Sequence, residues 1–248
     1  MRLIQISDLH CGLRFRGDTL QQAIEEINSL NADVIVVTGD LTEDGLLQEF
    51  QEAKRYLSQL KCRHMTVGSG NHDSRTTGHL LFPKFFSEPS TAIEFEDTAV
   101  IMLNSSRPDR EDGEVGFNQG LWLIGHLERF KDKFKIVALH HHIVPVPDTG
   151  MERNIVSDSG DLLRTLLSHN VGLVLCGHRH RPWFWEIAKL PIVYAGAIST
   201  TRLRGFFKNT YNIVTIKNGS IDIKLKVVGG AEYDLKAIGN LDLSDSMP

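Results

Sequence analysis

Hydrophobic and polar positions follow two spacings in the first part of the chain. Runs that are mostly apolar, at residues 2–6, 34–37 and 64–67, are typical of strands buried on both faces. Between them, residues 19–30 and 46–60 carry apolar side chains at three- and four-residue spacing, which predicts amphipathic helices. The order strand, helix, strand, helix, strand predicts parallel strands joined by right-handed crossovers.

The remainder of the chain adds shorter periodic segments separated by turn residues. We expect helices near residues 80–86, 121–130 and 162–167. We expect strands at residues 91–96, 100–103, 135–139, 172–176, 183–187, 192–195, 211–216 and 221–227, the last four of them antiparallel. Asp97-Thr98 and Asn218-Gly219 are predicted hairpin turns, and Asp18 is a candidate cap for the first helix.

These elements predict one α/β domain of mixed α+β character. We expect a four-layer αββα sandwich, in which helices flank two mixed sheets packed face to face. No repeat, low-complexity linker or break in composition divides the chain. The domain is expected to span residues 1–228, and a polar, acidic and loosely held C-terminal tail to occupy residues 229–248.

The composition narrows the possible functions without selecting one. The 248 residues are 41% hydrophobic, as in ordinary soluble domains. A net charge of -4 gives no support for a broad nucleic-acid-binding face, although a local one is compatible with it. Three cysteines do not make a disulfide framework, and neither a basic leader nor an apolar run of membrane length is seen, so we expect a cytoplasmic protein. The unusual feature is histidine, present eleven times and partly clustered.

The apolar run at 34–37 leads through Thr38 and Gly39 to Asp40, a carboxylate at the tip of a buried strand. Gly39 permits a sharp turn, so Asp40 can project over the carboxyl end of the sheet. Taken alone, Asp40 would be interpreted as a cap of the following helix. The other strand ends favour a metal ligand instead.

Five predicted strands end in residue types that bind metal ions. They are followed by Asp8 and His10, by Asp40, by Asn71 and His72, by His141, and by His178 and His180. Open α/β sheets place their sites at the carboxyl ends of parallel strands, so these side chains are expected to converge. Carboxylate, imidazole and amide ligands suit Mn, Fe, Zn or Co. Because the candidates exceed what one ion can use, we predict two divalent ions that share Asp40.

Five motifs, in this order, resemble those of the calcineurin-like metallophosphoesterase superfamily. They are Asp8-Leu9-His10, Gly39-Asp40, Gly70-Asn71-His72-Asp73, His141 and Gly177-His178-Arg179-His180. The compact size, the histidine run at 140–142 and residues 116–123 resemble the class III cyclic nucleotide phosphodiesterases of that superfamily. The resemblance implies the calcineurin-like phosphoesterase fold and a hydrolase with a binuclear metal centre.

The resemblance also implies roles for individual residues. One ion would be held by Asp8, His10, Asp40 and His180, and the other by Asp40, Asn71, His141 and His178. His72 would donate a proton while Asp73 orients its ring, and Asn71 and His72 would contact the phosphate. Arg179 and Arg202 are further candidates for pairing with a phosphate oxygen, although each taken singly is expected to face solvent.

The chain departs from the family pattern in two places. Ser69 stands where proline is common before Gly-Asn-His. The triple histidine is followed by Ile143-Val144-Pro145, where His-x-Pro is usual. Counting from the end of the strand places the ligand at His141, with His140 as the alternative.

The predicted reaction is hydrolysis of a small phosphodiester such as a 3′,5′-cyclic nucleotide. Two cations about 3.5–4 Å apart lower the pKa of a shared water, and the resulting hydroxide attacks phosphorus in line. His72 then protonates the leaving alkoxide. The alternatives are a nuclease, a phosphomonoesterase and a non-catalytic scaffold; the charge balance disfavours the nuclease, and the complete ligand set disfavours the scaffold. We expect no membrane partner, and the oligomeric state stays open.

Overall fold

Two six-stranded sheets form the centre of the computed structural model, which describes residues 1–248 except 152, 207, 218 and 241–248. The first sheet has the order β12-β11-β10-β1-β2-β3 and the second the order β4-β5-β6-β7-β9-β8. The first contains β1 (Arg2–Ile6), β2 (Val34–Thr38), β3 (His64–Gly68), β10 (Thr210–Lys217), β11 (Ser220–Val227) and β12 (Glu232–Asp234). The second contains β4 (Thr91–Phe95), β5 (Thr98–Met102), β6 (Phe134–Ala138), β7 (Leu173–Cys176), β8 (Trp183–Ile187) and β9 (Leu190–Tyr194).

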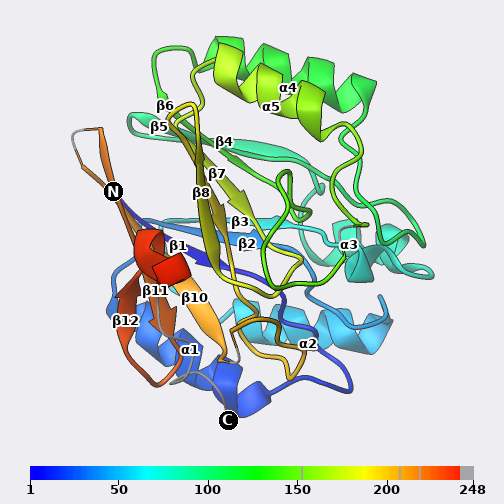
Figure 1. The fold of residues 1–248 in the computed structure, drawn as a ribbon. Coiled ribbons are helices and arrows are strands. Elements are labelled where there is room, and N and C mark those ends of the chain that lie inside the picture. Colours follow the sequence, from blue (N-terminus) through cyan, green and yellow to red (C-terminus); the bar gives the residue numbers. More distant parts are fainter. Residues whose placement is uncertain (152, 207, 218, 241–248) are drawn as a thin grey trace.

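Helices cover the outer face of each sheet. α1 (Gly17–Ser29), α2 (Leu47–Leu57) and α3 (Gly78–Phe85) pack on the first sheet, and α4 (Phe117–Arg129) and α5 (Ser159–Ser168) pack on the second. Figure 1 shows α4 and α5 above the sheets and α1 and α2 below them. The predicted αββα sandwich is therefore confirmed.

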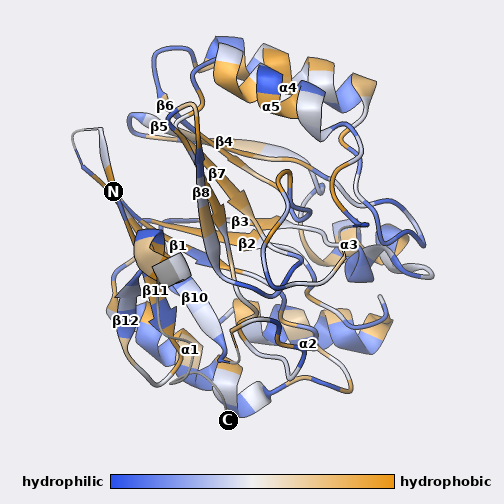
Figure 2. Ribbon diagram, in the orientation of Figure 1, coloured by the Kyte–Doolittle hydropathy of each residue, from blue (hydrophilic) through white to orange (hydrophobic). Residues whose placement is uncertain are grey.

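The alternation of side chains along β2 explains why this strand is apolar throughout. Ile35 and Val37 pack into the core under α1 and α2, whereas Val34 and Val36 pack into the core between the sheets. Successive strand residues point to opposite faces, so a strand covered on both sides needs no polar positions. In Figure 2 the central strands are mostly orange, while the helices carry blue residues as well.

The topology brings several strand ends to one region of the molecule. β1, β2 and β3 are parallel, and so are β5, β6 and β7. Because the sheets are stacked, the segments after β1, β2 and β3 meet the segments after β6 and β7. This is the arrangement on which the predicted site depends.

Some local predictions need correction. β9 runs antiparallel to β8 but parallel to β7, because it extends the parallel part of the second sheet. The register of β4 and β5 pairs Phe95 with Thr98, so Glu96 and Asp97 form the turn. α1 begins at Gly17, so Asp18 lies in its first turn and is not its cap. Of the Asn218-Gly219 turn, residue 218 lies outside the described residues, although β10 and β11 form the expected antiparallel pair.

The segment after residue 228 is partly packed against the domain. β12 pairs with β11, and the 3-10 helix η2 (Leu235–Asn240) buries Leu235 and Ile238 in the core between the sheets. The expectation of a loosely held tail is therefore wrong for this part, because apolar side chains at two positions hold it. The domain boundary itself stays a prediction, and residues 241–248 lie outside the described residues. Within the described part of the chain, no helix is both long and apolar enough to cross a bilayer.

Candidate metal centre

Several of the predicted ligands sit in a left-handed backbone conformation directly after their strands. The residues with positive φ include Asp8 (56°), His10 (52°), Asp40 (52°), His178 (73°) and His180 (53°). This conformation is uncommon for residues with a side chain, and it clusters at functional sites where surrounding structure enforces it. Here the loops support each other, since the Asp8 N–H donates to Gly39 O and the His10 N–H donates to Asp40 O, both at 3.0 Å.

Glycines allow the two sheets to approach at this point. Gly39 has a φ of 90°, and a Cβ there would lie 2.7 Å from the Gly70 nitrogen and 2.8 Å from His140 Nδ1. A Cβ on Gly70 would lie 2.1 Å from Asp40 Oδ1. Both positions therefore require glycine if Asp40 is to project over the strand ends.

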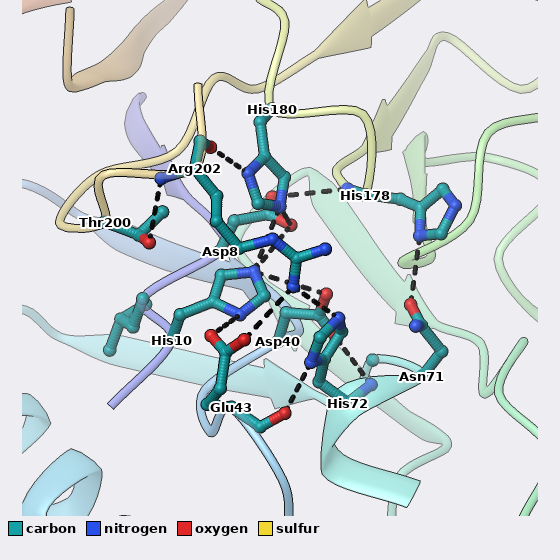
Figure 3. A network of polar contacts seen from close by, with 12 residues as sticks. Asp8, His10, Asp40, Glu43, Asn71, His72, His178, His180, Thr200 and Arg202 are labelled. Carbon is teal, nitrogen blue, oxygen red and sulfur yellow. Dashed lines mark hydrogen bonds and ion pairs between the residues drawn. The ribbon is translucent and has the colours of Figure 1, made fainter. Parts of the chain in front are cut away.

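A first group of donor atoms comes from the loops after β1, β2 and β7. Asp8, His10, Asp40 and His180 are all buried, and each offers an atom within 4.8 Å of the others' atoms. His10 Nε2 lies 3.0 Å from His180 Nε2 and 3.6 Å from Asp40 Oδ2. Figure 3 shows these side chains turned toward one another.

A second group shares one atom with the first. His140 Nε2 lies 3.3 Å from Asp40 Oδ2, 3.2 Å from His178 Nδ1 and 3.1 Å from Asn71 Oδ1. Asn71 Oδ1 is also 3.0 Å from His178 Nδ1. Asp40 therefore belongs to both groups and lies between them.

The donor set fits divalent cations better than it fits hydrogen bonding. In each group two imidazole nitrogens face each other, and one proton between them can satisfy only that pair of atoms, which leaves the other nearby lone pairs without a hydrogen. His140 Nε2 faces three acceptors at once, and a single N–H cannot satisfy them all. A cation accepts lone pairs from every donor simultaneously. Mixed carboxylate, imidazole and amide donors suit the borderline metals.

Burial and neighbouring charges shift the pKa values of several groups in the cluster. Burial by itself raises the pKa of Asp40, but the charge of the neighbouring His140 holds that pKa well below its usual range. Burial lowers the pKa of His140, but the Asp40 carboxylate outweighs it and raises the pKa to about 9. Burial also lowers the pKa of His10 to about 4, so its ring is neutral at pH 7 and keeps a lone pair for a metal.

Comparison with known proteins identifies the family. Residues 1–182 match the model of the calcineurin-like phosphoesterase family. The chain belongs to this family. It is a phosphoesterase of a metal-dependent kind, and the clustered histidine and aspartate donors lie where its strands end.

Individual relatives and solved structures agree with this membership. The phosphoesterase is 29% identical over 192 residues to a probable cyclic nucleotide phosphodiesterase from Synechococcus sp., covering 73% of this chain and 74% of that protein. It is also 29% identical over 202 residues to a glycerophosphodiester phosphodiesterase from Enterobacter lignolyticus, covering 73% and 71% of the two chains. In fold it is similar to a purple acid phosphatase from yellow lupin, with a TM-score of 0.73 at 14% identity over 94% of this chain and 52% of the other.

The structure corrects the choice between the two candidate histidines after β6. His140, not His141, lies beside Asp40 and His178. The Nδ1 atom of His141 accepts from the Ser105 hydroxyl, and its Nε2–H donates to Glu111 O at 3.2 Å. Burial lowers the pKa of His141 to about 3, so this ring is neutral. Both histidines lie in bends beyond the end of β6, where the alternation of a strand no longer holds, so a count in sequence could not tell which of them faces the first sheet.

Asp73 does not orient His72, contrary to the prediction. Its carboxylate accepts from the backbone N–H groups of Leu41 (3.1 Å), Thr42 (2.9 Å) and Gly70 (2.8 Å), and from the Thr42 hydroxyl (2.8 Å). It therefore ties the loop that carries Asp40 to the loop that precedes Asn71. Its buried position and the nearby charge of Asp40 raise its pKa to about 7.

The His72 ring is held by other groups. Its Nδ1–H donates to the Glu43 carbonyl, and its Nε2 lies 2.9 Å from Arg202 Nη1. A guanidinium has only donors, so His72 Nε2 must be the acceptor in this arrangement. Arg202 also pairs with Glu43 Oε1 at 3.3 Å and lines the cavity at the two donor groups. Its pairing with a phosphate oxygen stays a prediction.

Arg179 is placed differently from the prediction. It is buried, and its guanidinium donates to the Thr149 hydroxyl and carbonyl at 2.7–3.0 Å. It holds the 143–154 loop and is not among the residues that line the cavity at the metal groups. The expectation that Arg179 faces solvent is therefore wrong, and these contacts give no support for its pairing with a phosphate oxygen.

Other residues of this phosphoesterase site were not expected from the sequence. Glu43 Oε2 lies 3.1 Å from His10 Nδ1, so it fixes the His10 ring with Nε2 toward the donor groups. Burial raises the pKa of Glu43, but its bond to His10 outweighs this and lowers the pKa to about 2. In the sequence Glu43 stands in a polar stretch before a helix, where a carboxylate is ordinary.

The cavity at the two groups of donor atoms is small, about 30 Å³. It is lined by Asp40, Asn71, His72, Glu111, Asn154, His178, His180, Arg202 and Arg204. Glu111, Asn154 and Arg204 come from three separate loops and carried no motif that could have identified them.

Proposed function

We propose that this phosphoesterase hydrolyses a small phosphodiester, with a 3′,5′-cyclic nucleotide as the leading substrate, and that it holds two divalent ions of the Mn, Fe, Zn or Co type. The observation that carries the proposal is the position of Asp40, whose Oδ2 atom belongs to both donor groups. Relatives named as cyclic nucleotide and glycerophosphodiester phosphodiesterases support the choice of a diester.

In this proposal one ion is held by Asp8, His10, Asp40 and His180. The other is held by Asp40, Asn71, His140 and His178, with His140 replacing His141. Divalent ions at such a site supply Lewis-acid stabilisation of phosphoryl oxygens and lower the pKa of water. The remaining chemistry belongs to side chains of the protein.

Arg202 and His72 are proposed to act together on the substrate. When a phosphate oxygen accepts the hydrogen bond from Arg202, His72 Nε2 loses that hydrogen bond and can take up a proton from solvent. With the Nδ1–H held by the Glu43 carbonyl, a proton on Nε2 points into the cavity toward a leaving alkoxide. Asn71 contributes through its Oδ1 atom, which faces His140 and His178.

The test is a substrate panel on protein freed of metal by chelation and then reloaded with Mn. The panel comprises bis-p-nitrophenyl phosphate, p-nitrophenyl phosphate, 3′,5′- and 2′,3′-cyclic AMP and single-stranded DNA. We expect diesters to be hydrolysed faster than the monoester and Asp40→Asn to abolish turnover. Asp44→Asn, which removes an exposed carboxylate four residues away, is the matched control and should retain turnover.

A preference for the monoester would overturn the diesterase proposal, and rapid cleavage of DNA would favour a nuclease. A protein that binds no metal and turns over none of the panel would be a scaffold. The cytoplasmic location expected from the sequence stays a prediction.

A further inference from the structure

One charged residue in the cavity wall has no role in the scheme above. Glu111 lies in the 104–117 segment, and its Oε2 atom accepts from Asn71 Nδ2 at 2.9 Å. The other end of the same amide, Asn71 Oδ1, faces the second donor group. A carboxylate therefore stands one amide group away from the predicted ligand atom, at the edge of the space where phosphate must bind.

The position of Glu111 is firmly defined. Its Oε1 atom pairs with Arg75 Nη2 at 2.7 Å, and its carbonyl accepts from His141 Nε2 at 3.2 Å. The same loop is fastened at Asp109, whose carboxylate accepts from the Thr76 N–H at 2.7 Å. These contacts oppose any withdrawal of the carboxylate when a negatively charged ligand arrives.

The walls of the cavity differ in charge. Arg202 and Arg204 contribute cationic groups to the lining, whereas Glu111 contributes a carboxylate next to Asn71. A phosphodiester carries one negative charge and turns neutral ester groups toward part of the wall. A phosphomonoester carries nearly a second charge at neutral pH and has an additional charged oxygen that must face some part of the wall.

Resting on the proposed function, we propose that Glu111 is a specificity-determining residue that disfavours dianionic phosphomonoesters and so selects diesters at this site. A cavity of about 30 Å³ leaves a bound phosphate close to every wall, within the range of charge–charge interactions. The Glu111 side chain is 54% exposed and is paired with Arg75, so solvent and the pair weaken its repulsion. Selection of about 3- to 10-fold remains after that screening.

The test compares Glu111→Gln with Asp44→Asn, which removes a carboxylate from the same Arg75 but lies outside the cavity lining. Glutamine keeps a carbonyl oxygen for the Asn71 amide, so the metal content should not change. The ratio of kcat/KM for p-nitrophenyl phosphate to that for bis-p-nitrophenyl phosphate should rise about 3- to 10-fold in Glu111→Gln. The effect should shrink at high salt, and Asp44→Asn should leave the ratio unchanged.

A binding measurement gives a readout that does not depend on turnover. Calorimetric titration with inorganic phosphate at pH 8, where phosphate is a dianion, should show about 3- to 10-fold tighter binding to Glu111→Gln than to the unmodified protein. At high salt, which screens the Glu111 charge, the difference should shrink. If the unmodified protein hydrolyses no diester, the proposed function fails. The phosphate titration still tests whether Glu111 repels a dianion.

Three outcomes would overturn the assignment of Glu111. One is an unchanged ratio together with unchanged phosphate affinity in Glu111→Gln. Another is an equal change in Asp44→Asn, which would make the effect one of general surface charge. The third is a parallel loss of both activities together with metal, which would make Glu111 a positioning residue for Asn71.

Discussion

Replacing Asp73 by alanine should loosen both loops that carry metal ligands. The carboxylate accepts four hydrogen bonds, three of them from the buried backbone N–H groups of Leu41, Thr42 and Gly70. Leaving a buried donor unpaired costs about 1–3 kcal/mol. Entry of water and relief of the repulsion between Asp73 and Asp40 offset part of this, so we expect Asp73→Ala to lower the free energy of unfolding by about 3–6 kcal/mol.

The assay is urea denaturation of the metal-free protein, monitored by fluorescence and circular dichroism. The dependence of the free energy of unfolding on urea concentration should be the same for variant and unmodified protein, which checks two-state behaviour. Asp109→Ala is the control, because its carboxylate also accepts one backbone N–H, from Thr76, but at an exposed position. We expect the control to lose less than about 1 kcal/mol. Metal affinity should fall about 10- to 100-fold in Asp73→Ala. A stability loss below about 1 kcal/mol with normal metal affinity would show that Asp73 does not hold these loops.

Further expected outcomes concern the metal groups and the arginine above them. Asp40→Asn should reduce metal content at both groups, to below one ion per chain by elemental analysis, whereas retention of two ions would refute the sharing of its carboxylate. His140→Ala should lose one ion per chain while His141→Ala keeps both, and the reverse result would restore His141 as the ligand. Because the pKa of His140 is raised to about 9, its ring is protonated below that pH and must lose the proton to solvent before it can bind a metal. Metal affinity should therefore fall about tenfold per pH unit below pH 9. Calorimetry in buffers of different ionisation enthalpy should detect that proton at pH 7, and its absence would contradict the assignment. Arg202→Ala should raise KM for a diester by about 10- to 100-fold with a smaller change in kcat, while Arg202→Lys, which keeps the charge, should recover part of the loss.

The sequence predicted most of the fold because the strands of both sheets are buried. β2 is apolar at Val34, Ile35, Val36 and Val37 because helices cover one face and the second sheet covers the other. Such a run is recognisable without knowledge of its neighbours. The direction of β9 and the packing of β12 were not recognisable, because they depend on which strands lie beside them and on two apolar contacts at Leu235 and Ile238.

The same distinction applies to the site. Chemical types at strand ends, such as Asp8, Asp40 and His178, can be identified in a sequence because they interrupt apolar runs with residues that bind metals. The structure brings them together within a few ångströms. Glu43 and Glu111 could not be identified in this way, because a carboxylate in a polar loop has no pattern that separates it from its solvent-exposed neighbours.

What the sequence determined by itself was the set of elements and the residue types at their ends, since both follow from local periodicity and local chemistry. What only the tertiary structure decided was direction: which of two adjacent histidines faces Asp40, and whether Asp73 meets a ring or backbone N–H groups. The physical reason is that the direction of a side chain past the end of a strand is set by contacts between loops distant in sequence. The spacing of residues along one segment does not depend on those contacts, so it cannot predict the direction of the side chain.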